Sequence, residues 1–183
     1  MDNPLPLVLA AAAFAADRHR AQRRKDAEAS PYINHPLGLA DILAREGGVE
    51  DAEVIAAALL HDTVEDTETT IAEIEDRFGA RVAGIVAEVT DDKSLPKAER
   101  KRLQVVKSGS KSPGARLVKL ADKIANLRDI AAAPPADWTE ARKAEYLDWA
   151  KAVIDGLRGT SARLEAVFDA AYAAGRNPSP QPH

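Results

Sequence analysis

The chain has 183 residues, of which 45% are hydrophobic and 30% charged, enough for one soluble domain with a sizeable core. Aromatic residues make up only 4% and alanine supplies much of the apolar share, a composition that favours closely packed helices. The net charge of −4 argues against general nucleic-acid binding, and the absence of cysteine excludes disulfides, thiolate metal sites and cysteine nucleophiles.

The first apolar segment, residues 5–16, has the length and hydrophobicity of a signal-peptide core. The residues before it include Asp2 and no lysine or arginine, so the positive region of a secretory leader is missing. The segment is also too short to span a bilayer. We expect it to be the buried first half of a helix over about 7–27, in a cytoplasmic protein.

The rest of the chain reads as a succession of helices separated by polar turns. Asp51 is placed to cap the helix whose apolar run ends just before His61, and Thr69 or Thr70 to cap the helix that follows. The expected helices after the first cover about 36–47, 51–60, 70–78, 80–89, 96–107, 113–133, 137–157 and 161–173.

Two further features complete the expected fold. Asp137 and Glu140 have the spacing of a capping box, and no segment alternates with the period of a strand. We therefore expect an all-α, single-domain bundle of about eight to ten helices over residues 1–176, followed by a disordered C-terminal tail at 177–183.

A dense group of acids follows one of the apolar helices. His61 and Asp62 come directly after the apolar run, and Glu65 and Asp66 follow one turn later. Acids this close repel each other unless a cation or hydrogen-bond donors compensate their charge. A metal ion near the helix end could contact both His61 and Asp62, while Glu65 and Asp66 reach the same site without being ligands.

Asp122 is the second conspicuous acid, because it flanks the apolar stripe of a strongly helical segment at 117–127. With His35, His61 and Asp62 it would give two imidazoles and two carboxylates. Such a mixed nitrogen and oxygen set suits Mn²⁺, Fe²⁺ or Zn²⁺ better than Ca²⁺ or Mg²⁺.

Each of these residues also has an ordinary structural interpretation. His35 could cap a helix, Asp122 could pair with Lys119 or Lys123 at the surface, and the acids after His61 could form a solvated helix end. A His-Asp pair by itself is weak evidence for a metal site. The four residues together are a stronger indication than any one of them.

Basic and aromatic residues that could bind a substrate lie in two places. The first group consists of Arg18, Arg20, Arg23, Arg24 and Lys25. Its first three members suit a solvated helix face, whereas Arg24 and Lys25 lie nearest the turn leading to His35 and could contact a polyanion. On a later helix Arg142 and Tyr146 share one face at i and i+4, and could bind substrate or serve the fold.

Four blocks of the sequence resemble the hydrolase domain of RelA/SpoT homologues, within the HD superfamily of phosphohydrolases. The blocks are RK followed by YINHP at 24–36, ALLHDTVEDT at 58–67, LVKLADK at 117–123 and NLRD at 126–129. They follow the ligand order of that superfamily: a histidine, a His-Asp pair and a distant aspartate. The stretch 90–97, which contains TDDK and LPK, makes the chain most similar to stand-alone small alarmone hydrolases of the metazoan type. The resemblance covers about 10–164.

The resemblance implies an HD-type helical fold and a metal site. One Mn²⁺ ion, with Zn²⁺ or Fe²⁺ as alternatives, would be bound by His35, His61, Asp62 and Asp122. Glu65 and Asp66 would orient or deprotonate the attacking water, and Arg24 would lie against the guanine. The remaining contacts, to ribose or phosphates, would come from Lys25, Asn126, Arg142 and Tyr146. Every ligand and catalytic position of the pattern is present.

The implied activity is hydrolysis of the alarmone (p)ppGpp at its 3′ position to GDP or GTP and pyrophosphate, as in the stringent response. We expect direct attack by water, because no covalent nucleophile stands beside a base. The alternatives are an NADPH 2′-phosphatase, another nucleotide phosphohydrolase of the HD superfamily, and a guanine-nucleotide-binding module without activity. We expect a small-molecule nucleotide as partner and neither nucleic acid nor membrane; the sequence leaves the oligomeric state open.

Overall fold

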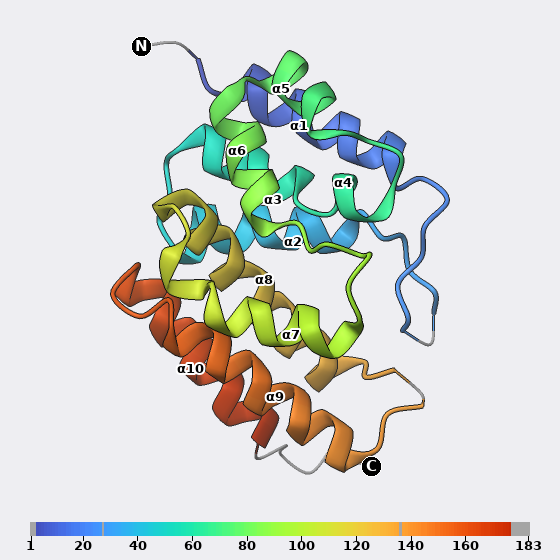
Figure 1. Ribbon diagram of the computed structural model, residues 1–183, viewed down its shortest axis with the longest axis vertical. Helices are drawn as coiled ribbons and strands as arrows, with labels where there is room; N and C mark the ends of the chain where they lie inside the picture. The colour runs from blue at the N-terminus through green and yellow to red at the C-terminus, as the bar shows by residue number, and fades with distance from the viewer. Residues whose placement is uncertain (1–2, 27, 136, 177–183) are drawn as a thin grey trace.

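A computed structural model describes residues 3–26, 28–135 and 137–176, and every regular element in that part of the chain is helical (Figure 1). The α-helices are α1 (Leu5–Arg18), α2 (Asn34–Asp41), α3 (Ala52–Leu60), α4 (Thr63–Asp66), α5 (Ile71–Phe78), α6 (Ala80–Val89), α7 (Lys97–Val106), α8 (Pro113–Ala132), α9 (Glu140–Asp155) and α10 (Ala162–Arg176). A π-helical turn, Ile42–Glu46, extends α2, and a 3₁₀ turn, Ser108–Ser110, precedes α8. The all-α class expected from the sequence is confirmed.

Helix α3 is the centre of the N-terminal half and packs against α1, α2, α6 and α8. The carboxylate of Asp51 caps it by accepting hydrogen bonds from the backbone N–H groups of Glu53 and Val54. Leu59 and Leu60, at its C-terminal end, are no more than 1% exposed. Because α3 ends inside the molecule, the residues that follow it begin in a buried environment.

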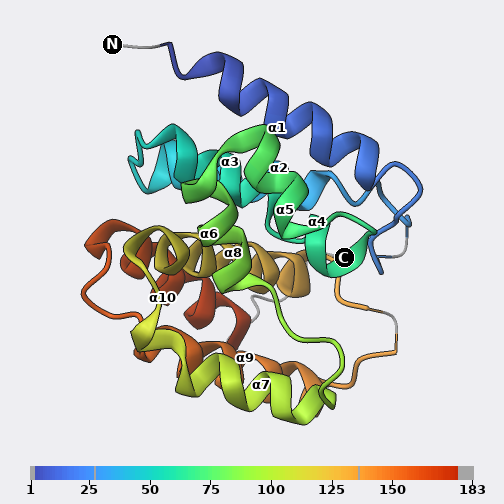
Figure 2. The ribbon, with the colours of Figure 1, turned by 45° about the horizontal axis from the view of Figure 1, so that its top comes forward.

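Helix α8 lies between the two halves of the molecule, with α1 to α6 on one side and α7 and α9 on the other (Figure 2). It contacts α2, α3, α6, α9 and α10. Ser112 caps it, and Pro113 occupies its first turn, where a missing N–H costs nothing. Asp122 near its middle is 8% exposed, so this acid is buried rather than on the surface.

Helix α1 ends nine residues before the position expected from the sequence. His19 closes the helix, with its backbone N–H bonded to the carbonyl oxygen of Ala15. The expected end, residue 27, lies outside the described residues. No apolar stripe continues beyond Arg18 to hold another turn against the core. Instead the chain doubles back, with Tyr32 N–H donating to Gln22 O at 3.2 Å.

The capping box expected at Asp137 is wrong. The side chain of Thr139 caps α9 by accepting a hydrogen bond from the N–H of Arg142, and the helix begins at Glu140. The tail expected at 177–183 lies outside the described residues. No described helix has the length and hydropathy needed to cross a membrane.

Candidate metal centre and substrate pocket

His61 stands at the C-terminal end of α3 with its ring already oriented. Its Nδ1 lies 2.8 Å from the carbonyl oxygen of Ala58, which fixes the proton on Nδ1 because a carbonyl can only accept. In the neutral ring Nε2 then carries the lone pair, and it lies 2.9 Å from Oδ2 of Asp62. This buried nitrogen has no hydrogen-bond partner among the described residues. Burial lowers the pKa of His61, but the charges of Asp62 and Asp122 outweigh it and raise that pKa, so the position favours a cation. A metal ion bound at Nε2 would take the place of the proton.

His35 and Asp122 reach the same point from two other helices. His35, on α2, is 5% exposed, and its ring centroid lies 5.3 Å from that of His61. Its Nε2 lies 4.0 Å from Asp62 Oδ2 and 3.5 Å from Asp122 Oδ1. One ligand atom each from His35, His61 and Asp62 fall within 4.8 Å of one another. Three of the four residues predicted as ligands thus form one group, and Asp122 adjoins it through His35. Their nitrogen and oxygen donors are of the kind that bind a divalent metal ion.

Neighbouring donors hold the two carboxylates in place. The Tyr32 hydroxyl donates a hydrogen bond to Asp62 Oδ2, and burial together with the Asp62 charge raises the pKa of Tyr32, which keeps it a donor. Lys123 Nζ lies 2.9 Å from Asp122 Oδ2, and Asn126 Nδ2 donates to Oδ1 at 2.7 Å. Such outer hydrogen bonds orient ligands around a metal.

The charges of the two carboxylates are stabilised although both are buried. Burial by itself raises the pKa of Asp122, but Lys123 and His35 outweigh it and hold that pKa well below its usual range. Burial acts in the same direction on Asp62, where His61 and His35 outweigh it and lower the pKa. Both residues are therefore carboxylates at neutral pH, which metal coordination requires.

Glu65 and Asp66, on the short helix α4, have different environments. Glu65 accepts a hydrogen bond from the Asp91 N–H at 3.0 Å, and Arg100 Nη1 lies 3.8 Å from its Oε1. Burial raises the pKa of Glu65, and the nearby charge of Asp62 adds to the effect. Asp66 instead has a donor on each oxygen, as described below. Glu65 thus takes up a proton more easily than an ordinary glutamate does.

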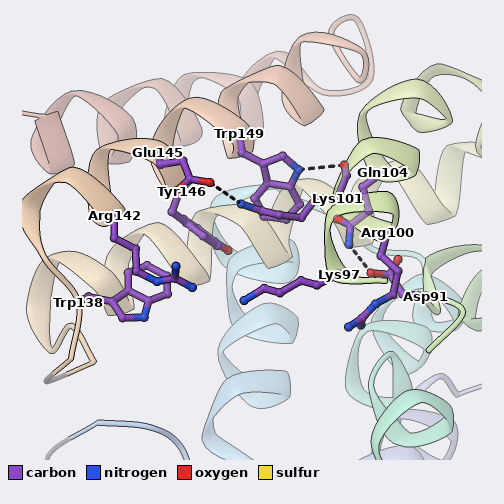
Figure 3. A pocket seen from close by; sticks show the side chains of 10 residues that line it. All are labelled: Asp91, Lys97, Arg100, Lys101, Gln104, Trp138, Arg142, Glu145, Tyr146 and Trp149. Carbon is purple, nitrogen blue, oxygen red and sulfur yellow. Dashed lines mark hydrogen bonds and ion pairs between the residues drawn. The ribbon is translucent and has the colours of Figure 1, made fainter. Parts of the chain in front are cut away.

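Two adjoining cavities contain all the residues predicted to bind substrate. The first, of about 380 Å³, reaches His35 and is lined by Arg24, Lys25, Asn126 and Tyr146 among others. The second, of about 210 Å³, contains Arg142 (Figure 3). The two cavities share Trp138 and Tyr146.

Of the remaining basic residues in the first group, Arg20 and Arg23 are exposed as expected. Arg18 is not a solvated residue: it lies over the Phe14 ring and pairs with Glu73.

The second cavity contains residues that the sequence analysis missed. Lys97, Arg100 and Lys101 line its α7 side, opposite Trp138 and the aromatic residues of α9 (Figure 3). The Arg142 guanidinium lies 5.0 Å from the Trp138 ring centroid. One signal was available, because the chain has only two tryptophans and three tyrosines. Both tryptophans and two of the tyrosines line these cavities.

A family model described as "HD domain" matches residues 11–149. The chain belongs to this family. The match includes every residue of the convergent His and Asp cluster and both acids of α4. In this HD domain the fold and the order of the histidine, the His-Asp pair and the distant aspartate agree with the expectation from the sequence.

Similar proteins extend the match to nearly the whole chain. A human protein named guanosine-3′,5′-bis(diphosphate) 3′-pyrophosphohydrolase MESH1 is 60% identical over 165 residues, covering 90% of this chain and 92% of the relative. The Drosophila melanogaster protein of the same name is 51% identical over 156 residues, covering 85% and 87%. A solved structure, reported as a metazoan ortholog of SpoT that hydrolyzes ppGpp, has a TM-score of 0.90 and 46% identity, covering 94% and 97%. The resemblance of this HD domain to stand-alone RelA/SpoT-type hydrolases is confirmed.

Proposed function

We propose that the chain is a metal-dependent guanosine-3′,5′-bis(diphosphate) 3′-pyrophosphohydrolase that converts (p)ppGpp into GDP or GTP and pyrophosphate. The observation that carries the proposal is the group formed by His35, His61 and Asp62, with Asp122 beside His35, next to a cavity that His35 lines together with basic and aromatic side chains. The names of the similar human and fly proteins support the same reaction.

The proposed metal is Mn²⁺, with Zn²⁺ or Fe²⁺ as alternatives, bound by the Nε2 atoms of His35 and His61 and by carboxylate oxygens of Asp62 and Asp122. When bound, the ion supplies Lewis acidity that lowers the pKa of a coordinated water molecule. The protein determines which nitrogen of His61 would bind the ion. The carbonyl oxygen of Ala58 accepts a hydrogen bond from Nδ1, so Nε2 is the nitrogen available to a metal.

Glu65 and Asp66 are the proposed catalytic acids. Hydrolysis transfers a water oxygen to the phosphorus attached to the ribose 3′ oxygen, releases pyrophosphate, and requires the water to lose a proton while the 3′ oxygen gains one. A carboxylate with a raised pKa can accept and return a proton near neutral pH, so we assign this transfer to Glu65. Asp66, which pairs with Lys93, is assigned the orientation of the reacting groups.

The substrate would occupy the two adjoining cavities. Arg24, which lies over the Tyr32 ring at 5.7 Å, offers a flat cationic surface for the guanine. The proposed contacts to ribose and phosphates come from Lys25, Asn126, Arg142 and Tyr146. Burial raises the pKa of Tyr146 to about 12, so it acts there as a neutral hydroxyl.

The wider properties follow from this proposal. The HD domain would span residues 1–176, with 177–183 as a separate tail, and the enzyme would act in the cytoplasm on a small nucleotide, without nucleic acid or membrane as a partner.

The test is to incubate the purified chain and Mn²⁺ separately with ppGpp, NADPH and deoxynucleoside monophosphates. Release of pyrophosphate from ppGpp, lost on chelation and restored by added Mn²⁺, is the expected result. Phosphate release from NADPH alone, or from monophosphates alone, would reassign the substrate. Tight ppGpp binding without turnover would indicate a binding module instead.

A further inference from the structure

A third buried histidine lies close to the metal centre, and the proposed function does not use it. His19 is 2% exposed and closes α1, and its ring centroid lies 4.8 Å from that of Tyr32. Its Nδ1 lies 2.7 Å from Oε1 of Gln22. Its Nε2 is buried and has no hydrogen-bond partner among the described residues.

Gln22 continues this contact to one of the catalytic acids. Its Nε2 donates a hydrogen bond to Asp66 Oδ2 at 3.0 Å, between residues 44 positions apart. The other oxygen of Asp66 accepts from Lys93 Nζ. Asp66 therefore has a donor on each carboxylate oxygen, one neutral and one cationic.

The chemistry of the groups determines which is donor and which is acceptor in the hydrogen bonds that link His19, Gln22 and Asp66. A carboxylate can only accept, so the amide nitrogen of Gln22 must face Asp66 and its amide oxygen must face His19. An amide oxygen also only accepts, so the proton of His19 lies on Nδ1. Reversing the amide would place an oxygen against the carboxylate and two N–H groups against a protonated Nδ1. Asp66 and the Nδ1 proton of His19 therefore favour the same orientation of the Gln22 amide.

We infer that His19 and Gln22 are positioning residues for Asp66, and that the chain His19 Nδ1–H to Gln22 Oε1 and Gln22 Nε2–H to Asp66 Oδ2 holds this carboxylate in its working orientation. The inference rests on the proposed function, since it assigns a role within the same site. The second donor, Lys93, has a side chain that is 50% exposed. Gln22 is half-buried and is held by the buried ring of His19, so it is the more rigid of the two restraints on Asp66.

Two substitutions of His19 separate positioning from packing. His19→Phe keeps an aromatic ring against Tyr32 but removes the donor that holds the Gln22 amide. The hydrogen bond from Gln22 to the charged Asp66 should then be lost, so kcat should fall about tenfold or more, with KM and metal content unchanged. His19→Asn keeps an N–H close to the place of Nδ1 but leaves a cavity. It should lower the melting temperature and keep kcat within about twofold of the unsubstituted enzyme. Equal losses of kcat in the two variants would overturn the inference.

Gln22 gives a second test, at a position that is only half-buried. Gln22→Met removes both hydrogen bonds with little change in shape, and should lower kcat as much as His19→Phe does. The double variant should lose no more than either single one, because both break the same chain. A multiplicative loss would contradict a shared chain. Arg20→Gln is the matched control: its side chain is 80% exposed and pairs with Asp17, and kcat should not change.

A spectroscopic measurement keeps this inference separate from the proposed function. The ¹⁵N resonances of the His19 ring in the Mn²⁺-free protein should show the proton on Nδ1, and Gln22→Met should abolish this preference. A proton on Nε2 in the unsubstituted protein would overturn the inference whatever the activity. If the unsubstituted enzyme released no pyrophosphate from ppGpp, the proposed function would fail, while the His19 resonances would still decide the hydrogen-bond chain.

Discussion

Replacing Asp122 with alanine should have two consequences that can be measured independently. The carboxylate contacts Lys123 through Oδ2 and faces His35 Nε2 through Oδ1, so its removal takes away both a metal ligand and the partner of a buried cation. The side chains of Asp122 and Lys123 are only 11% and 4% exposed. Removing one member of such a pair costs about 3–5 kcal/mol, because the other charge stays buried without compensation. A domain of this size is stable by roughly 5–15 kcal/mol, so the variant should fold but be weakened.

The double variant Asp122→Ala/Lys123→Met separates the two consequences. It removes the stranded ammonium group and leaves an unbranched apolar side chain against the Trp149 ring, where Lys123 Nζ now lies 4.4 Å from the centroid. Urea unfolding of chelated protein should show most of the stability restored. Metal analysis and the ppGpp assay should show that neither metal nor turnover returns.

Two results would refute this reasoning. Full turnover with a normal metal content in Asp122→Ala would exclude Asp122 as a necessary ligand. An unchanged free energy of unfolding in the same variant would show that Lys123 finds another partner.

Four further predictions concern neighbouring residues. Glu65→Gln should retain the metal and lower kcat by about 10²–10⁴, the usual contribution of a general base; unchanged turnover would exclude that role. Because burial raises the pKa of Glu65, kcat should decline as pH falls through a value above the ordinary carboxyl range, and the residual activity of Glu65→Gln should lack this limb. Arg142→Ala should raise KM for ppGpp about tenfold and leave kcat and metal content unchanged, as expected for loss of ground-state binding; a normal KM would remove Arg142 from the site. Asp51→Ala should destabilise the protein by about 1–2 kcal/mol in urea unfolding, through loss of the α3 cap and of the ion pair with Arg81; a smaller effect would mean that the first N–H groups of α3 do not need the Asp51 carboxylate.

The sequence predicted best those elements whose ends are determined locally. Asp51 and Thr70 cap α3 and α5 as expected, because a side chain that bonds an N–H two or three residues later needs no distant contact. The end of α1 was not predictable in this way. It depends on His19 packing against Tyr32, thirteen positions later, after the chain has doubled back. At α9 both Asp137 and Thr139 are residue types that cap helices well. Thr139 is the one with an extended backbone directly before the first helical residue, and its side chain accepts the capping hydrogen bond.

In the candidate site, too, local features could be predicted from the sequence and contacts between distant segments could not. The acids after α3 are close in sequence, so their clustering could be predicted from spacing. The sequence leaves Asp122 open between a metal site and an ion pair with a lysine. In the structure one of its oxygens lies near Lys123 and the other faces His35, so the ion pair does not exclude the proposed metal site. Lys97 and Trp138 come together only where α7 and α9 frame one cavity, and no local pattern encodes that contact.

The contacts around the proposed metal ligands compensate the buried charges of Asp62 and Asp122. Two buried carboxylates and two imidazoles would normally force the chain apart or take up protons. Here the Tyr32 hydroxyl donates a hydrogen bond to Asp62, and the ammonium group of Lys123 neutralises the charge of Asp122. Within the described structure, the close carboxylate partner of the buried Lys123 is Asp122, a proposed metal ligand. Stability and metal binding should therefore respond together to a change at Asp122.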